Sequence, residues 1–157
     1  MSMVLNAGDT ISGKMGKAVM NLNGSIEDLF MAKKVEAKTT IKKNTIYAIG
    51  TRATQHKAVG WEGKGTLTMF MFTSVFRNLV KQFSKTGVMP FFDLTVINDD
   101  PNSTIGRQTV VLYNCLLDDS IIARLDVGTD ELEDEVSFTF DDFDILDSFK
   151  KAKPIQR

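Results

Sequence analysis

The residues best suited to chemistry gather in one short stretch, HKAVGWEGKG, at positions 56–65. It contains the only histidine of the chain, the only tryptophan and three glycines. A histidine can activate a nucleophilic serine or cysteine, and a glycine cluster that precedes a lysine can cradle a phosphate. Each of these chemistries requires companion residues at a defined spacing.

The glycine cluster lacks the companions of a phosphate loop. Such a loop follows a strand, opens a helix and carries Ser or Thr after its lysine. Here Gly65 follows Lys64, and the next residues, TLTMFMF, alternate as a strand does. We therefore interpret the glycines as structural: they permit a bulge or a close backbone contact at the start of a strand, with Trp61 packing nearby.

Catalytic and metal sites are not predicted either. The sequence does not place a nucleophile and an orienting carboxylate beside His56, which lies in a polar, loop-like segment. One histidine and one cysteine cannot supply the usual ligands of zinc, and Cys115 lies in VVLYNCLL, where a buried strand position is expected. The acidic segment 126–147 lacks the regular spacing of a calcium loop. We expect no catalytic, cofactor or metal residues, and a protein that is not an enzyme.

Size and composition are those of one globular domain, residues 1–157, with 43% hydrophobic and 25% charged residues. The N-terminal residues show neither the basic start nor the apolar run of a signal peptide. No segment approaches the roughly 20 apolar residues that span a bilayer. We therefore expect a protein that is made in the cytoplasm and has no membrane partner.

Charge is distributed unevenly along the chain. Residues 1–64 have a net charge of plus five, residues 65–124 are neutral, and residues 125–157 have a net charge of minus six. The basic excess is diffuse and the pI is near 5.8, which argues against tight binding of nucleic acid. The asymmetry fits either ordinary solvated faces or two surfaces that meet in neighbouring copies of the chain.

Hydrophobic periodicity predicts about seven strands and one helix. A short strand ends at an Asn23-Gly24 hairpin turn, because both residues tolerate positive φ. A turn is also expected at Asp118-Asp119. The helix has apolar residues at three-to-four-residue spacing from Val75 to Phe83, between a Thr73/Ser74 cap and Gly87. The strands are expected at 16–22, 31–41, 66–72, 92–97, 107–117, 120–127 and 135–143.

One helix cannot cover both faces of a sheet this large. The sheet must therefore fold over on itself as a β-barrel or an orthogonal β-sandwich, with the helix plugging one opening. The strand over 31–41 is expected to be half-buried, with Met31, Val35, Ala37 and Ile41 on its inner side. The basic tail, residues 149–157, has little to bury and is expected to be loose.

These segments, in this order and spacing, resemble the tail tube proteins of contractile-tailed phages. The likeness is carried by ISGKMGKAVMNLNG, by the Gly-x-Arg ahead of His56-Lys57, by GWEGKGTLT and by the helix that follows. It covers nearly the whole chain. The resemblance implies a tail-tube-like fold and a structural protein of a phage or prophage contractile tail.

In that family, subunits self-assemble into hexameric rings, and the rings stack into the inner tube that conducts DNA. The resemblance thus implies further copies of the chain, the tail sheath, the tape-measure protein and baseplate or initiator proteins as partners, with DNA as transient cargo. It places the protein in the virion tail, after assembly in the cytoplasm of the bacterial host. An acidic or neutral lumen would keep DNA from adhering, so we expect some acidic residues of the last segment to face inward.

A long loop between two strands reaches the adjacent ring in that family, and residues 42–62 are its counterpart here. Their mixture of apolar and polar residues suits packing on another subunit. The expected inter-subunit contacts are Ile46, Tyr47, Ile49, His56, Val59 and Trp61.

Two other functions stay open on the sequence alone. The tube of a phage-derived protein-injection machine would share the fold without the DNA cargo. A monomeric β-barrel with a helix could instead carry a small hydrophobic ligand.

Overall fold

A computed structural model describes residues 3–29, 32–71, 73–151 and 155–156. Met31, the first residue of the strand expected over 31–41, and Phe72, the last of the strand expected over 66–72, lie outside the described residues. So do residues 152–154 and 157 of the expected tail.

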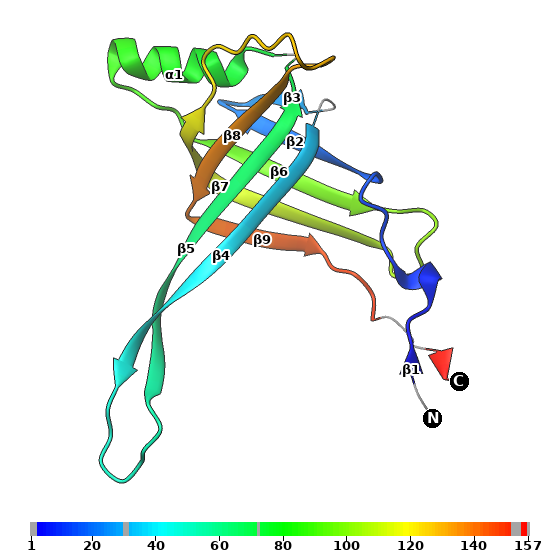
Figure 1. The fold of residues 1–157 in the computed structure, drawn as a ribbon, viewed down its shortest axis with the longest axis vertical. Coiled ribbons are helices and arrows are strands. Elements are labelled where there is room, and N and C mark those ends of the chain that lie inside the picture. The colour runs from blue at the N-terminus through cyan, green and yellow to red at the C-terminus, as the bar shows by residue number, and fades with distance from the viewer. Residues whose placement is uncertain (1–2, 30–31, 72, 152–154, 157) are drawn as a thin grey trace.

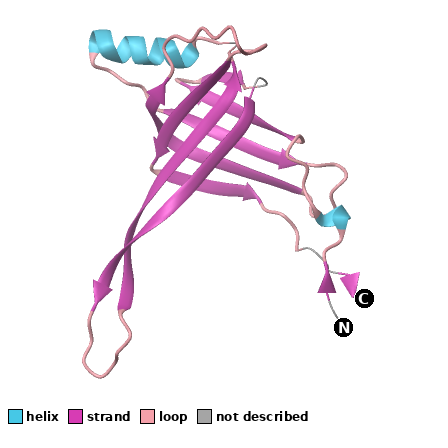
Figure 2. Ribbon diagram, viewed as in Figure 1, coloured by secondary structure: helices cyan, strands magenta, loops and turns pink. Residues whose placement is uncertain are grey.

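Most of the described chain is β-structure (Figure 2). The described part contains one α-helix, α1 (Val75–Thr86), and a short 3-10 helix, η1 (Ala7–Asp9). The strands are β1 (Met3–Val4), β2 (Gly16–Leu22), β3 (Ser25–Asp28), β4 (Ala32–Ile46), β5 (Gln55–Phe70), β6 (Phe92–Asp99), β7 (Arg107–Ser120), β8 (Glu133–Phe140), β9 (Asp142–Asp147) and β10 (Ile155–Gln156).

The main strands pair antiparallel in the order β3-β2-β6-β7-β8-β5-β4, and β9 pairs with β7 as well. Strand β7 is common to two groups: its first part pairs with β6 and β9, and its last residues pair with β8. The group β8, β5 and β4, with the end of β7, is called the arm sheet below. It crosses the strands behind it rather than running along them (Figure 1). This confirms the expected mostly-β fold with one helix.

A bulge at Asn114 turns β7 from one group to the other. In the register with β6, Phe92 lies opposite Cys115 and Leu94 opposite Leu112, so β7 has one extra residue between these pairs. Asn114 has a φ of 53°. Its backbone N–H donates to the Asp93 carboxylate at 3.2 Å, and its side-chain amide donates to Asp141 at 3.1 Å. Asn tolerates this left-handed conformation, and such bulges form the corners where strands switch sheets.

Apolar side chains from both groups of strands fill the space between them. Met20, Leu94 and Leu112 share one row of the register and are buried, as are Leu67, Met69 and Val136 of the arm sheet. The rings of Phe76, Phe92 and Phe138 follow one another across the interior, with centroids 6.1 and 6.2 Å apart. The centre of the fold is therefore occupied by side chains.

Helix α1 covers one end of the fold, as the sequence predicted. Phe76 and Leu79 are buried, whereas Phe83 is exposed. Gly87 ends the helix with a φ of 75°, and its N–H donates to the Phe83 carbonyl at 2.8 Å. Arg77 ties the helix to the arm sheet, because its guanidinium lies 2.8 Å from the buried carboxylate of Asp134.

The glycine cluster was expected at the start of a strand, but it lies within β5. Two of its members make the expected close backbone contact, and Gly60 lies next to a bulge. In the register, Gly63 pairs with Phe140 and Gly65 with Phe138. A Cβ at Gly65 would lie 2.4 Å from the Phe138 ring, and one at Gly63 would lie 2.5 Å from the Phe140 ring. The rings therefore lie against bare backbone. Gly60 has open space around its Cβ direction.

Three expectations about the strands are corrected. The predicted turn at Asp118-Asp119 is an irregularity within β7, which stays paired with β8 through Ser120, and residues 121–126 are not a strand. β4 is an edge strand with a mostly exposed surface, so Ala37 and Ile41 are not half-buried. The short strands β3 and β9 were not predicted. The Asn23-Gly24 turn is confirmed, with φ values of 52° and 82°.

The C-terminal tail forms a short strand near its end, which pairs with the first strand of the chain. Ile155 and Gln156 pair antiparallel with Val4 and Met3, which brings the two termini together (Figure 1).

Replacing Gly65 by Ala tests the ring-against-backbone contact. The added methyl group would overlap Phe138, so we expect the free energy of unfolding to fall by about 1–3 kcal/mol in urea titrations. Gly60→Ala is the matched control and should change it by less than about 0.5 kcal/mol, since the site is open. Equal effects of the two changes would show that the contact does not restrict residue 65.

Substitutions at Asn114 test the corner. Asn114→Gly keeps the left-handed backbone and loses the amide contact to Asp141, so we expect a loss of about 1 kcal/mol. Asn114→Val adds the strain of a β-branched residue at positive φ, which costs roughly 1–3 kcal/mol more. Both are measured by chemical unfolding, and a valine variant as stable as the glycine variant would contradict the assignment.

Candidate assembly surfaces

The arm sheet continues into a projecting hairpin. β5 pairs with both β4 and β8 along Gly63–Met69, but on the arm side of Gly63 strand β8 has ended and only β4 remains beside β5. Residues 40–62, called the arm below, extend as a two-stranded ribbon away from the body (Figure 1). Seven paired residues at about 3.3 Å each carry the tip about 23 Å from the root.

The segment expected as a loop over 42–62 is mostly paired. β4 runs to Ile46 and β5 starts at Gln55, so only residues 47–54 form the turn at the tip. Val59 is the extra residue of a bulge, because Lys42 pairs with Gly60 whereas Lys43 pairs with Ala58. The bulge increases the local twist of the ribbon.

The residues predicted as inter-subunit contacts are all exposed and lie at different heights along the arm. Tyr47 and Ile49, at the tip, are 84% and 107% exposed. Ile46 pairs with Gln55 just behind the tip, and His56 pairs with Thr45. Val59 and Trp61 are nearer the root. The structure therefore does not gather the six into one patch.

Trp61 has a role within the chain that the sequence did not reveal. Its ring lies 6.1 Å from that of Phe140 and 5.6 Å from that of Phe143, between centroids. Phe143 belongs to β9, so this cluster fixes the root of the arm against the corner of the fold. Trp61 and Phe143 each remain 41% exposed. The alternation of EVSFTFDDF predicted that Phe140 lies on one face of a strand with Val136 and Phe138, but it did not predict the contact of Phe140 with Trp61.

The two ends of the molecule differ in charge. Residues 42–57 of the arm carry four Lys or Arg and no Asp or Glu. Residues 126–135, at the opposite end beside α1, carry six Asp or Glu and no Lys or Arg (Figure 1). This localises the asymmetry predicted from the sequence: a basic arm and an acidic end, separated along the longest dimension.

The outer face of the arm sheet is polar and nearly balanced in charge. By register, one row contains Lys34, Thr68 and Glu135, and the next contains Glu36, Thr66, Ser137 and Asp119. A third row contains Lys38, Lys64, Thr139 and Leu116. Apart from Leu116, these rows consist of polar side chains. The charged ones are exposed and the Thr and Ser residues are half-buried, as suits a surface in contact with water.

The groups that could do chemistry are dispersed. Cys115 is buried at the corner, and burial, with the Asp93 carboxylate nearby, raises the pKa of its thiol to about 12. His56 is exposed on the arm. Among the described residues, no three His, Cys, Asp or Glu side chains are grouped so as to hold a metal ion. In the same part of the chain, no helix has the length and apolar character needed to cross a membrane.

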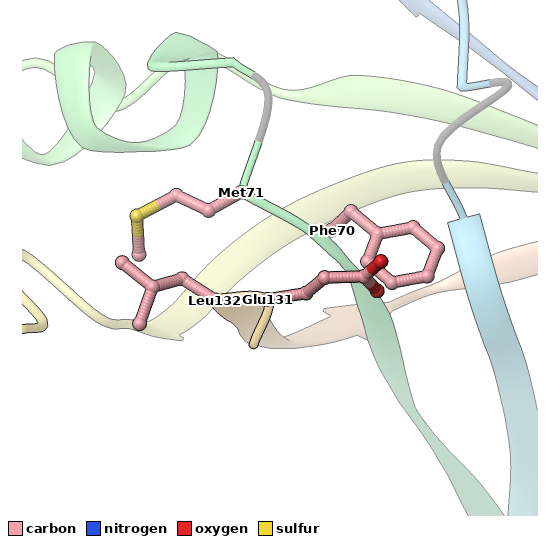
Figure 3. Close-up of a pocket in the computed structure, with 4 residues that line it drawn as sticks. All are labelled: Phe70, Met71, Glu131 and Leu132. Atoms are coloured by element: carbon pink, nitrogen blue, oxygen red, sulfur yellow. The ribbon is translucent and has the colours of Figure 1, made fainter. Parts of the chain in front are cut away.

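An apolar hollow of about 510 Å³ lies at the acidic end, where β5 ends at Phe70. It is lined by Phe70, Met71, Glu131 and Leu132 (Figure 3). The Met71 N–H donates to the Leu132 carbonyl at 2.9 Å, which fixes the two sides of the hollow to each other. The sequence gave no signal for it, because its walls come from segments about sixty residues apart.

The chain is similar to known proteins along most of its length. The family model for phage tail tube protein matches residues 3–147. The XkdM protein of the phage-like element PBSX of Bacillus subtilis (strain 168) is 41% identical over 143 residues, or 91% of this chain and 95% of XkdM. YqbM of the same organism is 39% identical over 150 residues, or 96% of this chain and 99% of YqbM.

A solved structure shares the fold. A chain in the sheath-tube complex of an extracellular contractile injection system in the extended state has a TM-score of 0.66. The identity is 12%, and the match covers 87% of this chain and 90% of that chain.

Ile49→Ser tests the arm tip as a contact surface. Nothing in the described chain covers Ile49, so we expect an unchanged thermal midpoint and weaker self-association in sedimentation experiments. Trp61→Ala is the comparison: it removes the contacts with Phe140 and Phe143 and should lower the midpoint by several degrees. Self-association of Ile49→Ser at the level of the parent protein would exclude Ile49 as a contact.

Proposed function

Because the chain belongs to the phage tail tube protein family, we propose that its copies close into hexameric rings and that the rings stack into the inner tube of a contractile tail. Its role in the tail is structural, and a tail tube protein is a component of the virion. The proposed conduit carries DNA, which passes through the tube without being retained.

The open edge of β4 is the observation that carries this proposal. β4 has fifteen residues and, within the described chain, pairs only with β5. A long free edge is a template for pairing with another chain. Five lysines lie on β4 and discourage pairing with unrelated strands: Lys33, Lys34, Lys38, Lys42 and Lys43. We assign this edge to the neighbouring copy in the ring, so that the arm sheets join into one wall.

The outer face of the arm sheet then lines the lumen. Apart from Leu116, its side chains in the three rows are Thr, Ser, Lys, Glu and Asp, with three positive and three negative charges. Glu135 is then one of the inward-facing acidic residues expected from the last segment. A polar face without a basic excess attracts the phosphate backbone only weakly. Such a wall suits a conduit for DNA.

Stacking of rings uses the ends of the subunit. The arm projects beyond the body at one end and is long enough to contact the ring that follows. The basic arm and the acidic end form a heterologous pair of surfaces, which continues as a filament rather than closing on itself. We propose the sheath, the tape-measure protein and baseplate or initiator proteins as the remaining partners, with assembly in the host cytoplasm.

A protein-injection tube is the second candidate. The likeness to a chain in the sheath-tube complex of an extracellular contractile injection system favours it at the level of the fold. The match to the phage family model and the identity to XkdM favour the phage tail. A ligand carrier is disfavoured, because Phe76, Phe92 and Phe138 fill the interior where a ligand would lie.

Electron microscopy of the concentrated, purified protein tests the proposed function. We expect rings or tubes with sixfold end views, because the free β4 edge and the two charged ends are present in every copy. Lone particles at all concentrations, even with tape-measure and baseplate proteins added, would contradict the proposal.

A further inference from the structure

We propose that the arm tip of one copy docks in the apolar hollow at the acidic end of a second copy. The inference rests on the proposed function, since it assigns the contact that joins successive rings. It names both sides of that contact: Tyr47, Ile49 and Arg52 on the tip, and Phe70, Met71, Leu132 and Glu131 at the hollow.

The hollow combines apolar side chains with one carboxylate. Four residues line it, Phe70, Met71, Glu131 and Leu132. Figure 3 shows the Phe70 ring beside the Glu131 carboxylate on one side of the backbone, and Met71 beside Leu132 on the other. A volume of about 510 Å³ lies within the range of roughly 300–1,000 Å³ typical of binding pockets. Surface hollows of this kind accept one or two anchoring side chains of a partner.

The acidic end has negative charge that the described chain does not neutralise. Two of its carboxylates are paired internally, Glu133 with Lys33 and Asp134 with Arg77. In the part of the chain described by the structure, Asp126, Asp130 and Glu131 have no ion pair, and of these Glu131 lines the hollow. A cationic partner would therefore find a free carboxylate at the hollow and further negative charge at the same end of the molecule.

The arm tip has the complementary composition. Tyr47 and Ile49 are the most exposed large apolar side chains of the arm. Arg52 follows them in the same turn, and none of Lys43, Arg52 and Lys57 forms an ion pair within the described chain. Tyrosine and arginine are the residue types that most often dominate binding energy at interfaces, because they combine apolar area with polar groups.

Geometry excludes the contact within one chain and favours it between chains. The tip and the hollow lie at opposite ends of the longest dimension of the molecule (Figure 1). A tip can therefore reach only the hollow of another copy, and each copy offers one tip and one hollow. Such a contact repeats from copy to copy along the tube axis.

Disulfide trapping in assembled tubes tests the assignment. The variant Ile49→Cys with Glu131→Cys should give a ladder of disulfide-linked chains after mild oxidation at pH 8. Native Cys115 does not interfere, because it is buried and the raised pKa keeps its thiol protonated. The matched control, Ile49→Cys with Leu146→Cys, places the second thiol on exposed β9 and should give no ladder.

The outcomes separate the docking site from the proposed function. Tubes without a ladder, or equal ladders in both variants, would overturn the docking site and leave the tube intact. Absence of tubes in the parent protein would overturn both.

Charge exchange provides an independent measurement. Arg52→Glu or Glu131→Lys alone should raise the critical concentration for assembly about tenfold, which corresponds to about 1.4 kcal/mol. The two changes combined in one chain should restore it, because every tip then meets a hollow of opposite charge. A double variant as defective as the worse single variant would contradict the pairing of Arg52 with Glu131.

Discussion

The bend of β7 at Asn114 is the constraint on which the rest of the fold depends. β7 is the strand common to both groups. It pairs with β9 before the bend and with β8 after it, so the position of the bend determines where one partner strand replaces the other. Asp93 and Asp141 hold the bend from its two sides by accepting hydrogen bonds from Asn114. Beyond the bend β8 no longer flanks β5, and the outer part of β5 is left with β4 alone.

The exposed features of the molecule follow from that divergence. Once β5 leaves β8 it can continue only as a two-stranded ribbon, which is marginally stable by itself and needs support at its root. Trp61, packed on Phe140 and Phe143, gives that support within the chain. Further along, the ribbon exposes Tyr47 and Ile49 with no cover from its own subunit. The ribbon is thus stabilised at its root by its own subunit, whereas the apolar side chains at its tip stay uncovered. These uncovered side chains are available for contact with another copy.

The elements that could be predicted from the sequence are those with one buried face and one exposed face. The 3.6-residue period gave α1 with Gly87 at its end, the alternation of TLTMF gave the inner part of β5, and Asn23-Gly24 gave the first hairpin. Residues 42–62 were predicted as a loop from the family resemblance, and the sequence did not correct this, because both faces of the arm are exposed and KKNTIYAIG and TQHKAVG have no apolar alternation to detect. Asp118-Asp119 has the composition of a turn, but β8 pairs beside it and keeps β7 extended. The hollow and the Trp61 cluster depend on long-range pairing, which periodicity does not encode.

Amide hydrogen exchange, compared between unassembled subunits and assembled tubes, tests most directly the claim that other copies complete this subunit. We expect the tip residues 47–54 and the outer edge of β4 to exchange rapidly in the subunit and to become protected in the tube, while Leu67 and Val136 of the core are protected in both. Tubes in which residues 47–54 and β4 exchange as fast as in the free subunit would contradict it.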